Sequence, residues 1–156
     1  MEQFHQTISK LANDLVTRFP EDTLVQFNYL PTLRAQLALN SHDTAKAIEL
    51  LQGGASFELG WSGALYPVYV RGEAYLTSHD GTGASVEFRK IVDYRGVVVN
   101  EPIGALAHLG LARAHNLQGD SAKARAAYQD FLESWKDADP DIPVLKQAKA
   151  EYAKLQ

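Results

Sequence analysis

Cysteine is absent from this chain of 156 residues, which excludes disulfides and thiolate chemistry. Long apolar runs are missing too: no segment reaches the roughly 18 consecutive apolar residues of a membrane span, so we expect no direct membrane insertion. Lysine and arginine form no basic run and the net charge is −4, which argues against a nucleic-acid partner. The polar N-terminus, Met1–Gln6, does not have the pattern of a secretory signal.

The composition is that of an ordinary globular protein. Apolar residues make up 46% of the chain and charged residues 22%, close to the average for soluble domains. A chain of this length fits one domain, so we expect a single domain over residues 1–156.

A repeated frame is present in three segments. Each copy has a small residue followed twelve positions later by an alanine, and successive copies start 37 and 40 residues apart. The pairs are Ala35 and Ala47, Gly72 and Ala84, and Ala112 and Ala124. Four positions after the second alanine stands Leu51, Phe88 or Tyr128. Small residues let two helices approach closely, and the larger residue fills the remaining space at helical spacing.

This frame predicts an all-α fold of antiparallel helix hairpins, an α-solenoid of about eight helices. We expect helices at 2–18, 24–40, 43–53, 64–77, 82–95, 101–117, 120–137 and 142–155. Turn and N-cap residues separate the two helices of each pair, for example Ser41-His42-Asp43 and Gly119-Asp120. Pro31 either kinks the second helix or delays its start. The Gly- and Ser-rich stretch 53–63, with Phe57 and Trp61, is expected to be a loop.

The pattern resembles the tetratricopeptide repeat (TPR), in which each repeat is a pair of helices marked by small residues and an aromatic. The resemblance implies helix pairs at 24–53, 64–95 and 101–137. Residues 1–20 resemble the second helix of an incomplete repeat, which implies that the chain was cut from a longer one. At the other end, 142–155 is expected to be a capping helix, because Val144, Leu145, Ala148, Tyr152 and Leu155 form one apolar stripe.

A narrower resemblance covers nearly the whole chain. The segments 19–31, 100–110 and 135–143 are similar to the C-terminal TPR region of serine/threonine protein kinases common in acidobacteria. The resemblance implies an accessory or regulatory region for a kinase domain elsewhere in the parent chain. It also implies a cytoplasmic location by default, with an extracytoplasmic one where the parent chain spans a membrane.

Candidate chemical groups have simpler structural interpretations. His42-Asp43 and His79-Asp80 occupy equivalent turns, as expected of repeated units rather than of a metal site. His108 and His115 are about 10 Å apart along one helix, too far to share a metal, and fall on packing positions. We therefore predict no catalytic residues, no metal and no cofactor, and we expect a protein that is not an enzyme.

The expected function is binding of a protein or peptide in the concave groove lined by the first helix of each pair. Aromatic rings there would supply contact area, and polar groups would orient a bound backbone. The predicted groove residues are Tyr29, Thr32, Gln36, Asn40, Tyr66, Tyr69, Glu73, Thr77, Leu109, Arg113 and Asn116. An alternative also stays open: a structural spacer or a homodimer formed through the N-terminal end.

Overall fold

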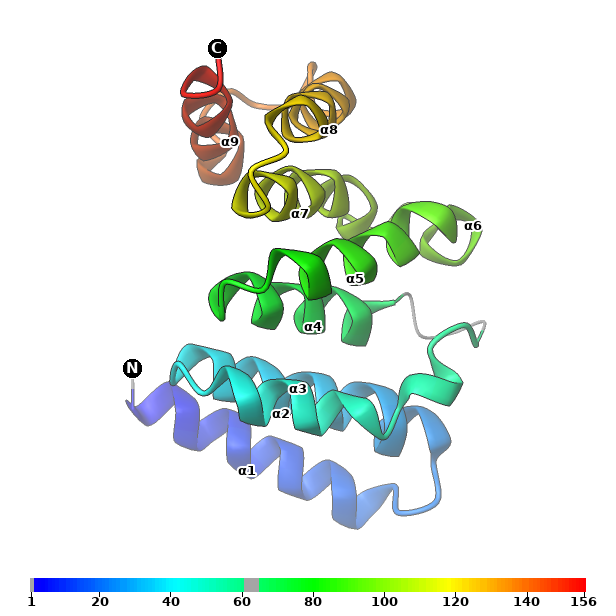
Figure 1. Ribbon diagram of the computed structural model, residues 1–156. Coiled ribbons are helices and arrows are strands. Elements are labelled where there is room, and N and C mark those ends of the chain that lie inside the picture. Colours follow the sequence, from blue (N-terminus) through cyan, green and yellow to red (C-terminus); the bar gives the residue numbers. More distant parts are fainter. Residues whose placement is uncertain (1, 61–64) are drawn as a thin grey trace.

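The computed structural model describes residues 2–60 and 65–156, and all regular secondary structure in these two ranges is helical (Figure 1). The all-α prediction is confirmed. The α-helices are α1 (Glu2–Arg18), α2 (Leu30–Asn40), α3 (Thr44–Gln52), α4 (Tyr66–Thr77), α5 (Gly81–Asp93), α6 (Arg95–Val98), α7 (Ile103–Leu117), α8 (Ser121–Ser134) and α9 (Pro143–Ala153). A π-helical turn, Val25–Tyr29, precedes α2, and a 3-10 turn, Ala55–Phe57, follows α3. Trp61, predicted to lie in a loop, is outside the described residues.

Successive helices pack against one another in chain order. Three-residue connections (41–43, 78–80 and 118–120) join α2 to α3, α4 to α5 and α7 to α8, and the helices of each pair are in contact. Neighbouring pairs meet because α3 packs on α4 and α5 packs on α7. In addition, α2 contacts α4 and α4 contacts α7. The elements therefore follow one another from α1 at one end to α9 at the other (Figure 1).

The three hairpins turn in the same way. In each, one residue in the left-handed region closes the first helix: His42 (φ 62°), His79 (φ 61°) or Gly119 (φ 77°). The aspartate that follows caps the second helix, with its carboxylate accepting a hydrogen bond from the backbone N–H three residues on, at 2.8–3.1 Å.

The backbone completes a Schellman motif at each of these turns. Asp43 N–H donates to Ala38 O at 2.9 Å, and the equivalent bonds of Asp80 and Asp120 measure 2.8 and 3.0 Å. The structural interpretation of the His-Asp pairs is confirmed, because the histidine is the left-handed turn residue and the aspartate is the cap.

The ring of Phe88 explains why positions 72 and 110 are glycines. The ring is fully buried between α4 and α7. A Cβ added to Gly72 would come within 2.8 Å of this ring, and one added to Gly110 within 2.6 Å. Both helices therefore need a residue without a side chain where they meet the ring, and only Gly72 was part of the predicted frame.

Three local features differ from the expected helix boundaries. The chain is already helical before Pro31, which lies in the first turn of α2, and the turn just before it is widened to a π turn. A short helix, α6, occupies part of the expected connection and ends at Val98, and the next residue, Val99, has a φ of 53°. Finally, α8 ends at Ser134, three residues early, where Trp135 turns back to pack on Phe131 at 5.1 Å between ring centroids.

Apolar side chains attach both terminal helices, and on α9 they are those of the predicted stripe. On α1, Ala12 is buried against α2 and Leu15 packs beside it. On α9, Leu145 and Ala148 belong to the main core, with Tyr152 packed against it. In the described part of the chain, no helix is both long and apolar enough to cross a membrane.

Candidate functional site

The predicted groove residues lie on three helices that contact one another in sequence, α2, α4 and α7, and on the π turn before α2. We call this surface the α2–α4–α7 face. Tyr29 and Tyr66 are 47% and 37% exposed, and the polar residues among the predicted set are exposed or half-buried. Leu109 is the exception and corrects the prediction. It is only 1% exposed and belongs to the main core, because it is enclosed where α7 packs on its neighbours.

One end of this face is an apolar hollow of about 330 Å³. It is lined by Leu15, Asn28, Tyr29, Thr32, Leu33 and Tyr66, and we call it the aromatic hollow. The Thr32 hydroxyl donates a hydrogen bond to the backbone oxygen of Asn28 at 2.6 Å, so this hydroxyl proton is already used within the chain. The hollow therefore offers mainly ring and aliphatic surface to a partner.

Tyr66 is held in place at the edge of the hollow by Glu101. Its hydroxyl donates to a Glu101 carboxylate oxygen at 2.8 Å, across 35 residues of sequence. This hydrogen bond, with a smaller effect from burial, raises the pKa of Tyr66. The ring is thus positioned by a contact with the segment before α7, and its face remains available in the hollow.

The centre of the face contains Tyr69 and Glu73, one helical turn apart on α4. The Tyr69 ring packs edge-on against Phe88, with centroids 5.7 Å apart, and burial raises its pKa. Burial also raises the pKa of Glu73, opposed by the charge of Arg113. Within residues 2–60 and 65–156, no hydrogen bond or ion pair reaches the Glu73 carboxylate. Tyr69 therefore supports the core, whereas Glu73 presents an unmatched charge.

Arg113 forms its ion pair with Glu151 of α9 and not with Glu73. Its Nε and Nη2 donate to the two carboxylate oxygens of Glu151 at 2.9 and 3.1 Å. Tyr128 donates its hydroxyl to the same carboxylate at 2.9 Å, and Gln147 donates its side-chain amide at 2.8 Å. This contact ties α7 and α8 to the C-terminal helix.

A second hollow, of about 500 Å³, lies beside this contact. Its lining residues are Leu76, Arg113, Asn116, Leu117, Tyr128, Glu151, Lys154 and Leu155. Two predicted residues, Arg113 and Asn116, are among them. The two hollows lie at opposite ends of α4 and include five of the predicted residues, Tyr29, Thr32, Tyr66, Arg113 and Asn116. Glu73 lies on α4 between the two ends and lines neither hollow.

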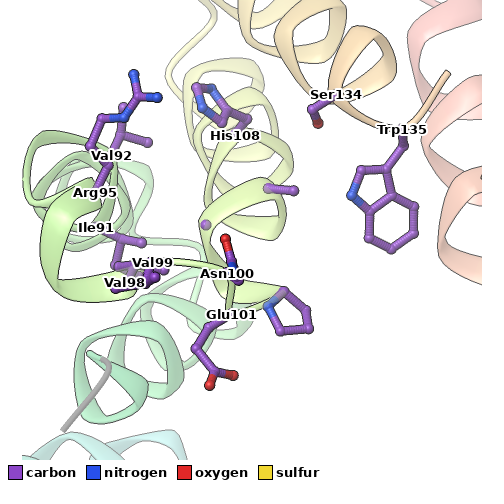
Figure 2. A pocket seen from close by; sticks show the side chains of 13 residues that line it. Ile91, Val92, Arg95, Val98, Val99, Asn100, Glu101, His108, Ser134 and Trp135 are labelled. Carbon is purple, nitrogen blue, oxygen red and sulfur yellow. The ribbon is translucent and has the colours of Figure 1, made fainter. Parts of the chain in front are cut away.

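A larger pocket, of about 510 Å³, lies between α5, α6, α7 and the end of α8. Figure 2 shows Arg95 and Val92 on one side of it, Trp135 on the other, and His108 and Asn100 between them. His108 Nδ1 is 3.7 Å from an Asp130 carboxylate oxygen, and burial lowers the pKa of this histidine. None of these residues belongs to the predicted groove.

A buried ion network that was not predicted joins the connection after α3 to α4 and α5. Glu58 and Arg71 are almost completely buried and form an ion pair at 2.6 Å. Arg71 also contacts Glu87 at 2.6 Å, and Lys90 pairs with Glu58. An arginine among the small and apolar residues of α4 was the available signal, but the partner carboxylate lies in the connection.

Comparisons of the chain with protein-family models, with curated proteins and with solved structures gave no match. In the two described ranges, no three His, Asp or Glu side chains come together as ligands for a metal ion. His115 is buried and its Nδ1 lies 3.4 Å from the Gln118 side-chain oxygen. We take the α2–α4–α7 face as the candidate site, because predicted groove residues line the aromatic hollow on it and its three helices contact one another in sequence.

Proposed function

We propose that this chain is a TPR-like α-solenoid module that binds a segment of another polypeptide on the α2–α4–α7 face. The three hairpins with the same Schellman turn and aspartate cap support the repeat assignment. The contacts of α4 with both α2 and α7 support a continuous surface along which an extended segment can lie. We assign this surface a binding role and no catalytic one.

The aromatic hollow is the observation that carries the proposal. Its volume, about 330 Å³, lies within the range of small binding pockets. Tyr29 and Leu33 leave apolar surface exposed there, and Tyr66 is fixed by Glu101 rather than free to fold over the opening. Burial of one leucine or phenylalanine side chain of a partner would contribute about 1.5–3 kcal/mol.

The test is selection of a phage-displayed library of random dodecapeptides on the immobilised protein, followed by titration of the selected peptides. Tyr29→Ala removes a wall of the hollow, and we expect it to weaken binding by about 30-fold, the equivalent of about 2 kcal/mol for a tyrosine hot spot. The matched control is Tyr94→Ala, because Tyr94 is 46% exposed but lies at the end of α5 outside the hollow.

Binding should be unchanged in the control, and both variants should keep the wild-type circular dichroism spectrum. Peptides that bind the two variants equally well would contradict the assignment of the hollow. Failure of the library to yield any peptide that binds the wild-type protein would contradict the proposed function itself.

A role as the accessory region of a serine/threonine protein kinase forms part of the same proposal. Its support is the resemblance of segments 19–31, 100–110 and 135–143 to the repeat region of such kinases. Binding of a partner segment next to a kinase domain would bring a substrate or a regulator to that domain.

A homodimerisation scaffold is the second candidate, and exposed apolar residues near the N-terminal end favour it. Leu11 on α1 is 56% exposed, and Phe27 stacks on Phe57 with centroids 4.6 Å apart while both rings stay more than a third exposed. Sedimentation equilibrium at micromolar concentrations distinguishes the two candidates. A dimer that is insensitive to salt and is lost in Phe27→Ser would favour the scaffold over the peptide-binding module.

A further inference from the structure

The unmatched carboxylate on the α2–α4–α7 face indicates what kind of segment fits there. Glu73 is half-buried, and the positive group whose charge acts on it, the Arg113 guanidinium, already donates two hydrogen bonds to Glu151. Arg113 therefore pairs with Glu151 and acts on Glu73 only through its charge, while no hydrogen bond or ion pair reaches the Glu73 carboxylate among the residues described by the structure. A half-buried charge of this kind gains from a cation that a partner brings.

The aromatic hollow lies at a defined distance from this charge. Tyr66, on the edge of the hollow, and Glu73 are both on α4, seven residues apart, so they occupy the same side of the helix. Seven residues correspond to about 10 Å along a helix axis. Tyr69 lies between them on α4. Its ring packs edge-on against Phe88, so its position in the surface between the hollow and Glu73 is fixed.

We propose that the segment bound on this face is basic: it places an apolar side chain in the aromatic hollow and a lysine or arginine against Glu73. An extended, polyproline-II-like segment presents residues i and i+3 on one side with about 9 Å between them, which matches the interval on α4. The recognised sequence is therefore an apolar residue and a cation three positions apart. This inference rests on the proposed function and adds the chemistry of the partner to it.

The experiment is a double-mutant cycle between Glu73→Gln and the bound peptide. The peptides are those selected from the random library, each also synthesised with its lysine replaced by acetyl-lysine or its arginine by citrulline. Removal of either charge should weaken binding about tenfold, and removal of both should cost little more than removal of one. Binding of the charged pair should also weaken as ionic strength rises.

The control on the protein side is Glu133→Gln, since Glu133 is an exposed carboxylate on α8, paired with Lys136. It should leave binding unchanged. Because the peptide changes do not touch the protein, they test the charge pair even if Glu73→Gln alters folding.

The possible results separate the inference from the proposed function. Peptides that require Tyr29 and carry no preferred lysine or arginine, or that bind Glu73→Gln as well as wild type, overturn the inference and leave the proposed function standing. Peptides that bind independently of Tyr29 overturn the inference together with the assignment of the hollow, and a library that yields no binding peptide overturns the proposed function. A lysine or arginine that is enriched three positions from an apolar residue and is coupled to Glu73 supports the inference.

Discussion

Glu58 provides the most direct test of how the connection after α3 is held. Its side chain is 1% exposed and pairs with Arg71 at 2.6 Å and with Lys90. In Glu58→Gln, Arg71 keeps Glu87 at 2.6 Å and the Leu51 carbonyl oxygen at 3.3 Å, whereas Lys90 loses its charged partner. The loss should therefore lie near the lower end of the values measured for breaking buried ion pairs, about 3 kcal/mol.

Urea unfolding followed by far-UV circular dichroism measures this loss. For a chain of this size, about 3 kcal/mol corresponds to a decrease in Tm of about 6–12 °C. The matched control is Glu49→Gln, in which an exposed carboxylate loses its pair with Lys46, at an expected cost below about 0.5 kcal/mol.

The stability difference between wild type and Glu58→Gln should depend on pH. Burial alone would raise the pKa of Glu58, but the hydrogen bonds and charges of Arg71 and Lys90 outweigh it and lower the pKa below 4.5. The stability that the carboxylate contributes is complete above 4.5, its value in the unfolded chain, and is lost as the pH falls through the lower folded-state pKa. The difference between wild type and Glu58→Gln should therefore shrink in acid. A cost equal to that of the Glu49→Gln control at neutral pH would refute this reasoning.

Two further substitutions test the packing around α7. Gly110→Ala places a Cβ 2.6 Å from the Phe88 ring and should destabilise the fold by about 1–3 kcal/mol in urea unfolding. The control, Gly53→Ala, has open space around the added Cβ and should be nearly neutral. Equal effects of the two substitutions would show that the ring is not enclosed as described. Glu151→Gln weakens the bidentate contact with Arg113 and should increase backbone amide exchange in α9 more than in α4. An equal increase in both helices would argue that the contact does not hold α9 in place.

The candidate site could be predicted in its position and only partly in its chemistry. Counting along the repeat frame identified Tyr29, Thr32 and Tyr66, which line the aromatic hollow, because helical periodicity decides which side chains share a face. The same counting placed Leu109 on the surface, although it is buried. It also placed Arg113 in the groove, although its guanidinium pairs with Glu151 of α9.

Local interactions explain what the sequence by itself determined. Asp43, Asp80 and Asp120 each cap a helix through a hydrogen bond from the backbone N–H three positions on, and Gly72 meets the Phe88 ring sixteen positions away. Such contacts are visible in a short window of sequence. The helices, their turns and their close approaches therefore follow from the order of the residues.

The tertiary structure alone decided where the charges go. Glu58 reaches Arg71 across 13 residues, and Glu151 reaches Arg113 across 38. The sequence does not distinguish an exposed charged side chain from one in a buried ion pair. The cost of burial and the gain from pairing depend on which segments pack together, and that is decided by the tertiary structure. Glu73 became the unmatched charge of the α2–α4–α7 face for this reason: the packing of α9 on its neighbours gave Arg113 a different partner.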